Sequence, residues 1–448
     1  MTPFEIGLLA LAAMVLLVLL GLYVPIALML CSFVGVWAIR GSPELAGNML
    51  ALAANDTIAS YFFGVVPLFV LMGFVVSEAG IGRDAYDVAN ALFRRIRGGL
   101  GIGTVGANAI FAAVTGISIA SAAVFTRIAV PEMLRHGYTQ RFALGIVAGS
   151  SVLGMLIPPS LLLILYGLLT EQSIGDLFAA GIVPGLLLAV FFALGVIVLA
   201  LLAPRFTGTA AGVVEEEPAG ALLLKAMPIT LLIVLVLGGL YGGIFTPVEA
   251  GAVGAIAAIV VGVLKLALVR AGVPGLSGGL TWGGFRRVLV ETGLVTASIS
   301  FLIIAAQMYS RMLAFSGVPA GFAEGITTAE IGFWGTVLIY VLVVIALGMI
   351  LDSSSIMLIL VPLMLPVVTG MGVDLIWFGI VTVIAVEIGL LTPPFGISVY
   401  VIKSTLDDPS VTLGQIFLGA APFAAIMAIV LALVMVFPGL ATFLPEVL

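Results

Sequence analysis

Charged residues are scarce in this chain, and their scarcity decides its class. Only 8% of the 448 residues are charged, whereas 62% are hydrophobic. A soluble domain has about 25% charged residues, so this chain has too few to cover a water-exposed surface. Apolar stretches of about 20 residues, long enough to cross a bilayer, recur from residue 5 to residue 445. We therefore expect an all-α polytopic protein in a lipid bilayer, with no nucleic-acid partner.

Cysteine and histidine are almost absent. Cys31 is the only cysteine, which excludes a disulfide within the chain and a metal site built from cysteines. His136 is the only histidine and lies in a basic loop segment, so it has no second imidazole with which to bind zinc. An intramembrane enzyme would therefore lack most of the cysteine and histidine side chains on which catalysis or metal binding usually depends. We expect no enzyme activity and no cofactor.

The apolar runs form two halves of similar layout. The first half covers residues 1–203, a polar linker covers 204–225, and the second half covers 226–448. Each half contains two apolar segments that we interpret as a re-entrant helical hairpin, followed by a helix broken by two prolines. We expect hairpins at about 99–131 and 331–369, broken helices at 140–172 and 375–404, an amphipathic helix at 83–97, and further spans at 5–23, 24–40, 60–79, 176–203, 226–243, 246–266, 290–311 and 413–445.

The basic residues indicate the orientation. If each hairpin returns to its own side of the membrane, fourteen of the 16 Lys and Arg residues fall on one side, and only Arg40 and Arg311 fall on the other. An excess of Lys and Arg marks the cytoplasmic side, so we expect the linker 204–225 to be cytoplasmic. Five full spans in each half is an odd number, which predicts that the second half is inverted relative to the first.

A shift of 235 positions brings the two halves into register. Ser118 then matches Ser353, and the pair Pro158-Pro159 matches Pro393-Pro394. These are the only two Pro-Pro pairs in the protein, and each begins four residues after a glycine. Matches of single glycines mean little in a chain with 55 of them. The matched pairs, in contrast, indicate an internal duplication.

The Pro-Pro pairs interrupt helices inside the membrane. Two successive prolines remove two backbone donors and clash with the preceding turn, which frees carbonyl oxygens that lipid cannot satisfy. The hairpin tips, residues 115–118 and 352–355, add hydroxyl and carboxylate oxygens, and the helix N-termini there favour anions. Each break with its hairpin therefore offers oxygen ligands for an alkali cation and N–H groups for an anion. The alternative is that the prolines merely kink packed helices and the serines cap them.

Several motifs together resemble the large membrane subunit of tripartite ATP-independent periplasmic (TRAP) transporters. They are PEMLRHGY at 131–138, GMLIPPS at 154–160, FAAGIVPG at 178–185, GIFTPVEA at 243–250 and GLLTPPFG at 389–396. The resemblance covers nearly the whole chain. It implies an elevator-type secondary transporter of the bacterial inner membrane that imports a small organic anion, usually a carboxylate, on a sodium gradient. It also implies two partners, namely a separate small four-helix membrane subunit and a periplasmic substrate-binding protein.

The same resemblance implies that sodium ions bind between each hairpin tip and the broken helix that faces it. The matching positions are Thr115, Ser118, Gly154, Ile157 and Pro159 in the first half, and Asp352, Gly389, Thr392 and Pro394 in the second. Ile117 departs from the pattern, because the first tip of the family is commonly richer in glycine and serine. The candidate substrate-binding residues are Ser353, Ser354 and Arg311.

The sequence leaves the roles of three charged residues open. Asp352 is either only the N-cap of the helix that follows or also part of a site. Glu387 is an ionisable residue inside an apolar run, which indicates a function with a partner, but the sequence does not name that partner. Arg311 either extends its guanidinium to the membrane surface or binds the carboxylate of the substrate.

Two other functions compete with this one. A stand-alone sodium–carboxylate symporter would have the same architecture and need no binding protein, and only the family motifs favour the tripartite system over it. A non-transporting membrane scaffold would gain nothing from duplicated helix breaks, which are costly in a bilayer. The sequence does not identify the solute, the sodium stoichiometry or the oligomeric state.

Overall fold

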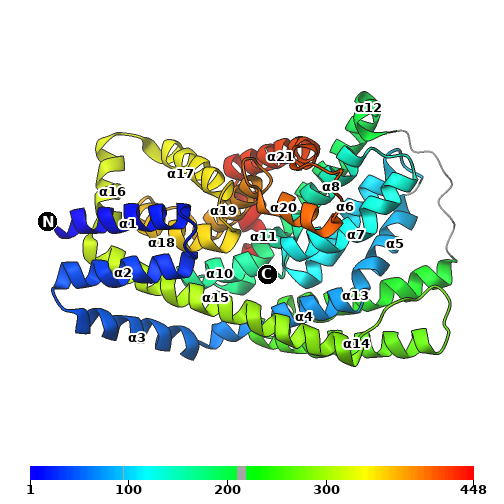
Figure 1. Cartoon of the computed structure of the whole chain (residues 1–448), viewed down its shortest axis with the longest axis horizontal. Coiled ribbons are helices and arrows are strands. Elements are labelled where there is room, and N and C mark those ends of the chain that lie inside the picture. Colours follow the sequence, from blue (N-terminus) through cyan, green and yellow to red (C-terminus); the bar gives the residue numbers. More distant parts are fainter. Residues whose placement is uncertain (94, 209–217) are drawn as a thin grey trace.

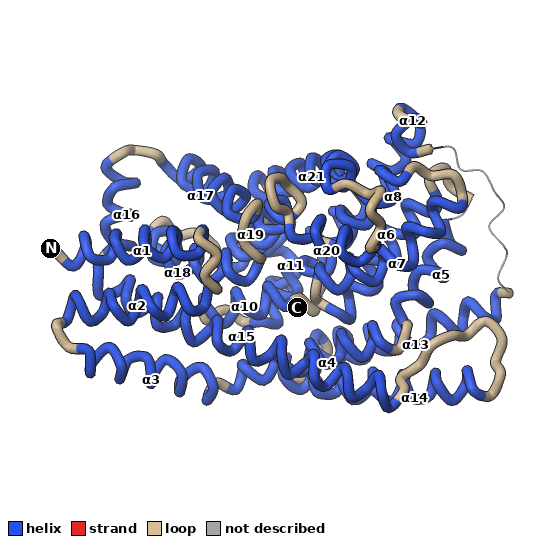
Figure 2. The backbone as a smooth tube through the Cα atoms, in the orientation of Figure 1, coloured by secondary structure: helices blue, strands red, loops and turns tan. Residues whose placement is uncertain are grey.

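Helices make up the fold (Figures 1 and 2). The structure, a computed structural model, describes residues 1–93, 95–208 and 218–448. Within these residues there is no strand, and one isolated bridge joins Tyr138 to Gly208. Seven of the described helices are long and apolar enough to cross a membrane, or eight if the bent pair α4 (Val65–Glu78) and α5 (Ile81–Phe93) forms one span. The expected all-α polytopic fold is confirmed.

One group of helices runs along the length of the molecule, and we call it the long-helix layer (Figure 1). It combines the N-terminal helices with three helices from the second half, and its members pack side by side. Besides α4 it contains α1 (Pro3–Leu19), α2 (Val24–Arg40), α3 (Pro43–Ala59), η1 (Tyr61–Gly64), α13 (Ala219–Tyr241), α14 (Pro247–Arg270) and α15 (Trp282–Ser316). The short helix α16 (Val318–Thr328) follows α15.

The second group contains both hairpins and both broken helices, and we call it the hairpin body. Its two halves are interleaved, since α8 packs against α21, α10 against α18 and α7 against α20. From the first half it contains α6 (Gly99–Thr115), α7 (Ser118–Arg135), α8 (Gln140–Ser151), α9 (Leu153–Leu156), α10 (Leu161–Thr170), α11 (Ile174–Leu202) and α12 (Pro204–Thr207). From the second half it contains α17 (Gly332–Gly348), α18 (Ser353–Gly370), α19 (Leu375–Leu390), α20 (Ile397–Leu406), α21 (Leu413–Val436) and α22 (Gly439–Val447).

Helix starts in the two halves follow the offset found in the sequence. The second helices of the hairpins, α7 and α18, begin at Ser118 and Ser353, and the helices after them, α8 and α19, begin at Gln140 and Leu375. Both pairs of start points are 235 residues apart. The duplication seen in the sequence therefore has a counterpart in the helices. The inverted placement of the halves in the membrane, and the limits of each repeat, remain predictions.

Some elements differ from the expected ones. The segment between two expected spans, residues 41–59, contains helix α3. Ser42 caps this helix by accepting a hydrogen bond from the Leu45 amide, and Pro43 takes the first helical position. The expected final span 413–445 is two helices, because the chain turns before Pro438 and α22 packs against α11. α15 is 35 residues long and extends beyond the expected 290–311 at both ends.

Two interhelix ion pairs hold α5 against the long-helix layer, just after α4 and α5 bend by 67°. Asp84 pairs with Lys265 of α14 at 2.5 Å, and both side chains are at most 2% exposed. Asp87 pairs with Lys225 of α13 at 2.7 Å. The sequence predicted α5 as an amphipathic helix. It could not predict these ion pairs, because each lysine lies far along the chain from its acidic partner, and the lysines served only to indicate the orientation in the membrane.

The expected linker 204–225 is partly helical. α12 occupies its first residues, and α13 begins at Ala219. Residues 209–217, which include the three glutamates of the linker, lie outside the described residues. Arg94, one of the basic residues counted for the orientation, also lies outside them.

Candidate functional site

The first hairpin turns over two residues. α6 ends at Thr115, Gly116 has a left-handed backbone with a φ of 65°, and α7 begins at Ser118. The Thr115 hydroxyl donates to the Phe111 carbonyl at 2.9 Å, which leaves the oxygen lone pairs of the hydroxyl for a cation. Ile117 gives the first turn of α7 no side-chain cap. The N–H groups of that turn can therefore serve a ligand.

The first broken helix touches this tip through its backbone. α9 ends at Leu156 and α10 begins at Leu161, and residues 157–160 between them contain the Pro-Pro pair. The Leu161 amide donates to the Gly116 carbonyl at 3.1 Å. A methyl group on Gly116 would lie 2.3 Å from the Pro159 carbonyl oxygen, so only glycine fits at this contact.

Gly154 lies against the same tip. A methyl group on Gly154 would lie 3.1 Å from the carbonyl carbon of Ile117 and 3.2 Å from the nitrogen of Ser118. The structure thus places Thr115, Ser118, Gly154 and Pro159 around one tip, whereas Ile157 lies against Gly185 of α11. All five sodium-site positions predicted for the first half are buried.

The second hairpin has a carboxylate at its tip. α17 ends at Gly348 and α18 begins at Ser353, with Asp352 as its N-cap. Asp352 accepts a hydrogen bond from the Ser355 amide at 3.1 Å and another from the Ser355 hydroxyl. The capping role of Asp352 is therefore present in the structure. A carboxylate has about four lone-pair positions, so capping leaves room for a ligand.

The second broken helix repeats the backbone contact of the first. The amides of Phe395 and Gly396 donate to the Met349 carbonyl at 3.2 and 3.3 Å. Before the break, a methyl group on Gly389 would lie 2.6 Å from the Cα of Gly348. In both halves, then, an amide just after the Pro-Pro pair binds a carbonyl near the hairpin tip, and a glycine before that pair lies against the hairpin.

The other predicted positions of the second site differ in their surroundings. The Thr392 hydroxyl donates to the Ile388 carbonyl at 2.7 Å. The acceptor lies four residues earlier in the chain, as it does for Thr115 and Phe111 in the first half. Thr392 is half-buried, whereas Pro394 is exposed. Thr392 and Pro394 thus lie on the break that touches the hairpin near Met349, and Gly389 lies in the last turn of α19 before it. Asp352 caps its own helix.

Ser353 and Arg311, both predicted to bind substrate, have different surroundings. Ser353 is buried and donates to Glu387 Oε1 at 3.3 Å, whereas Ser354 is partly exposed. Arg311 donates to Asp56 Oδ2 at 2.6 Å in a polar cavity of about 510 Å³ between α3, α15 and the turn from α10 to α11. Neither serine lines that cavity. The ion pair with Asp56 accounts for the charge of Arg311.

Glu387 has the partner that the sequence could not name. This side chain of α19 is 1% exposed, and besides Ser353 the hydroxyl of Ser118 interacts with its carboxyl group. The two serines begin α18 and α7, so Glu387 lies between the two hairpin tips. The spacing of these residues in the sequence gives no signal of this contact, because it joins three separate helices.

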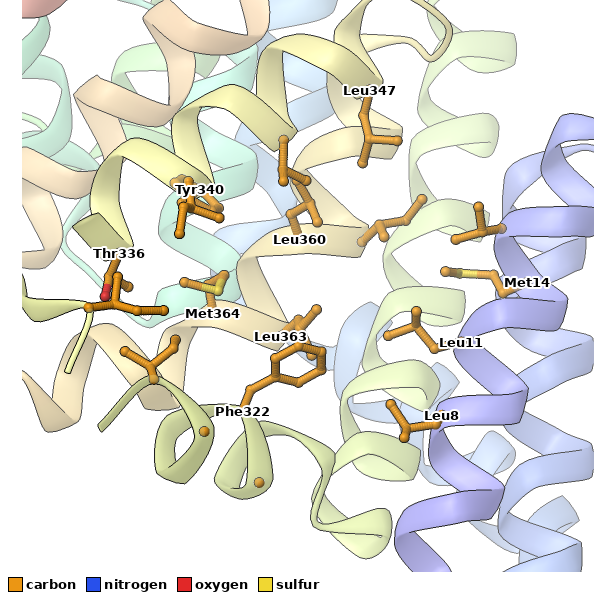
Figure 3. A pocket seen from close by; sticks show the side chains of 18 of the residues that line it. Leu8, Leu11, Met14, Phe322, Thr336, Tyr340, Leu347, Leu360, Leu363 and Met364 are labelled. Carbon is orange, nitrogen blue, oxygen red and sulfur yellow. The ribbon is translucent and has the colours of Figure 1, made fainter. Parts of the chain in front are cut away.

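An apolar cavity of about 750 Å³ lies between α1, α16, α17 and α18 (Figure 3). Leu11, Phe322 and Leu363 line it from three of these helices. Of the described residues that line it, Thr336 and Tyr340 carry hydroxyls, and these already bond to a backbone carbonyl and to the hydroxyl of Thr382. This cavity therefore does not suit a carboxylate solute.

A family model and several relatives match nearly the whole chain. Residues 11–440 match the family model described as "Tripartite ATP-independent periplasmic transporter, DctM component". The chain is 34% identical over 402 residues to the C4-dicarboxylate TRAP transporter large permease protein DctM of Pseudomonas aeruginosa, with 89% of each protein covered. It is 32% identical to the sialic acid TRAP transporter large permease protein SiaM of Vibrio cholerae, with 89% of this chain and 90% of that protein covered.

A solved structure of similar fold is that of the YdaH transporter of Alcanivorax borkumensis. The TM-score is 0.59, the sequence identity is 15%, and the match covers 86% of this chain and 87% of that one. At this identity the likeness shows the fold alone.

Proposed function

Because the chain belongs to the DctM component family of tripartite ATP-independent periplasmic transporters, we propose that it imports a small carboxylate solute on a sodium gradient. The chain is the large membrane subunit of such a transporter, it crosses the bacterial inner membrane several times, and it is not an enzyme. In the proposed system a periplasmic binding protein delivers the solute, and a small four-helix membrane subunit completes the complex.

The paired contact between hairpin tip and helix break carries the sodium part of the proposal. Each break frees backbone carbonyls, and a threonine beside each tip or break, Thr115 or Thr392, keeps lone pairs free. Hard cations prefer such carbonyl and hydroxyl oxygens. One sodium ion would bind at each pair, held in the first half by Thr115, Ser118 and the residues of the break, and in the second by Thr392 with Asp352 and neighbouring carbonyls.

The carboxylate part of the proposal rests on the helix starts and on the relatives. Two helix N-termini, those of α7 and α18, begin at the buried serines Ser118 and Ser353. Helix N-termini favour anions through their N–H groups and dipole. The similar proteins from Pseudomonas aeruginosa and Vibrio cholerae carry C4-dicarboxylate and sialic acid in their names. Ser353 and Ser354 would contact the solute in this proposal.

We also propose an elevator motion, in which the hairpin body moves against the long-helix layer. Both sites lie in the hairpin body, whose halves are interleaved through contacts such as that of α7 with α20, so they can move together. The bent pair of α4 and α5 connects the two groups of helices, and the buried pair of Asp84 with Lys265 fixes one side of that connection.

Uptake in proteoliposomes tests the proposal. The purified chain is reconstituted with the small membrane subunit and the binding protein of its own transport system, and radiolabelled succinate and sialic acid are the first probes. We expect uptake that requires an inward sodium gradient, fails with potassium or choline in place of sodium, and needs no ATP. Full uptake without sodium would overturn the proposal.

The same experiment separates the competing functions. If the chain alone moved the solute at the full rate, it would be a stand-alone symporter. If the complete system bound solute but moved none under any gradient, the chain would be a scaffold. Dependence on sodium and on both partners is the result that the tripartite proposal predicts.

A further inference from the structure

Glu387 is a buried acid with no basic partner among the described residues. Its side chain is 1% exposed and lies in α19, two residues before Gly389. An ionisable side chain at membrane depth is costly and normally has a function. Asp84, the other deeply buried acid named above, is compensated by Lys265 at 2.5 Å. Glu387 instead has serine hydroxyls beside it.

The carboxyl group of Glu387 connects the two hairpins. Its Oε1 accepts a hydrogen bond from Ser353 at 3.3 Å, and the Ser118 hydroxyl interacts with the same group without a hydrogen bond of good geometry. Among the described residues, both Oε2 of Glu387 and the Ser118 hydroxyl lack a hydrogen-bond partner. Buried polar atoms are normally satisfied. The carboxyl group thus has one hydrogen bond, from Ser353, while its Oε2 and the Ser118 hydroxyl each keep capacity for another.

The two serines are equivalent residues of the two halves. Each is the first residue of the hairpin helix that follows the tip, and they are 235 positions apart. Ser118 belongs to the proposed first sodium site, and Ser353 follows Asp352 of the proposed second site. The Ser353 hydroxyl lies 3.3 Å from Glu387 Oε1, which is longer than the usual distance of about 2.5–3.0 Å between hydrogen-bonded oxygens, so a small shift of that tip would strengthen or break this bond.

We propose that Glu387 is a positioning residue that couples the two sodium sites, an inference that rests on the proposed function. Sodium at one site fixes its hairpin tip, and the serine of that tip then orients the shared carboxyl group. The oriented carboxyl holds the serine of the other tip in place, so the second ion binds more tightly. By reciprocity each site affects the other equally, and such couplings are typically about 5–150-fold in affinity.

Sodium dependence of binding and uptake tests this coupling. The probe is ²²Na⁺ binding to the purified chain, followed by uptake in the complete system. Wild type should bind sodium with a Hill coefficient above one. E387Q cannot accept hydrogen bonds from both serines through two oxygens, so its Hill coefficient should fall to about one, and its half-saturating sodium concentration should rise by about fivefold or more. Ser118→Ala and Ser353→Ala should each do the same.

Matched variants distinguish coupling from loss of stability. Ser353→Thr keeps the hydroxyl and should keep the cooperativity. Tyr340→Phe removes another buried hydrogen bond to α19, that of Tyr340 with Thr382 at 3.0 Å, without touching either tip. It should leave the Hill coefficient unchanged. Should E387Q fail to reach the membrane, Ser353→Ala decides the question, because Ser353, unlike Ser118, is not a proposed sodium ligand.

The outcomes separate this inference from the function on which it rests. If wild type shows no sodium dependence in binding or uptake, both the proposed function and the coupling fail. If wild type depends on sodium with a Hill coefficient of one, or if E387Q and both serine variants keep the cooperativity of wild type, the coupling is overturned and the sodium-driven function stands.

Discussion

The two helix breaks both contain a Pro-Pro pair, but they differ in how deeply they are buried. Around the first break all residues from 151 to 160 are buried, whereas Pro393, Pro394 and Phe395 of the second break are exposed. The contrast is largest at a pair of equivalent positions, where Ser160 is 0% exposed and Phe395 is 51% exposed. The backbone contact with the hairpin is nevertheless the same in both halves.

Neighbouring helices cause this difference. At the first site, a methyl group on Gly73 of α4 would lie 2.8 Å from the Thr115 carbonyl, and one on Gly181 of α11 would lie 2.4 Å from the Leu156 carbonyl. Small residues thus let α4 and α11 cover the first hairpin and its break. The contact between tip and break is therefore set by the repeated sequence, while access to each site is set by the helices around it.

A methyl group at the first tip should break the buried site most severely. Gly116→Ala places a Cβ 2.3 Å from the Pro159 carbonyl oxygen and strains a backbone with a φ of 65°. Overpacking of this kind costs about 1–3 kcal/mol or more, and we expect nearly complete loss of uptake. Gly243→Ala is the matched control, because Gly243 has a φ of 67° but nothing within 4 Å of the added methyl. Normal uptake by Gly116→Ala would show that the tip and the break need not touch.

Thiol labelling should show the difference in access directly. In a variant with Cys31 replaced by serine, single cysteines are placed at the equivalent positions, Ser160→Cys and Phe395→Cys. Maleimide should modify the cysteine at 395 many times faster than the one at 160, because thiols react in proportion to their access to the reagent. Denatured samples should label equally, which controls for intrinsic reactivity. Equal rates in the folded protein would contradict the buried first site.

Removal of one hydroxyl from each site should show whether burial increases the cost of a lost ligand. Loss of a buried polar ligand costs about 1–3 kcal/mol, or about 5–150-fold in the sodium concentration for half-maximal uptake. Water can replace the lost oxygen more easily at the exposed site. Thr392→Ala should therefore lie near the lower end of this range and Thr115→Ala near the upper end.

Serine variants control this comparison. Thr115→Ser and Thr392→Ser keep the hydroxyl and should change the sodium dependence little. Membrane abundance is measured for every variant, because a folding defect would lower it. If Thr392→Ala reached the membrane normally with unchanged sodium dependence, Thr392 would not be a ligand, and the second site would have to be reassigned.

The smallest expected effect concerns the tip of the second hairpin, where Asp352 both caps α18 and belongs to the proposed site. Asparagine is as good an N-cap as aspartate, whereas alanine costs about 1 kcal/mol. If Asp352 serves only as a cap, Asp352→Asn should match wild type in thermal stability and sodium dependence. If its charge also serves the ion, Asp352→Asn should keep the stability but weaken sodium dependence. We expect the second result.

The sequence was sufficient for much of the fold because its signals are local. The helix breaks at the Pro-Pro pairs follow from the backbone chemistry of proline. The start of α18 at Ser353 follows from its N-cap, Asp352. What it could not show depends on contacts between distant segments. The burial of the first break, the pairing of Arg311 with Asp56 and the place of Glu387 between two hairpins all arise from helix packing.

The sequence predicted that each hairpin tip faces a helix break, but not that the two pairs differ in burial; that sodium binds there stays a prediction. In the first half, Gly116 and Gly154 bring the tip and its break together and the break is buried. In the second half, Asp352 caps its own helix and the break is exposed. A duplicated sequence predicts equal sites. Only the surrounding helices, such as α4 and α11 at the first tip, make them unequal.

Equilibrium binding of ²²Na⁺ to the purified chain most directly tests whether both breaks hold sodium. This measurement needs neither the solute nor the partner proteins. We expect saturable binding that unlabelled sodium displaces and potassium does not, with Thr115→Ala and Thr392→Ala each losing high-affinity binding of one ion. Binding that does not saturate, or that both variants retain unchanged, would contradict the assignment of a sodium site to each break.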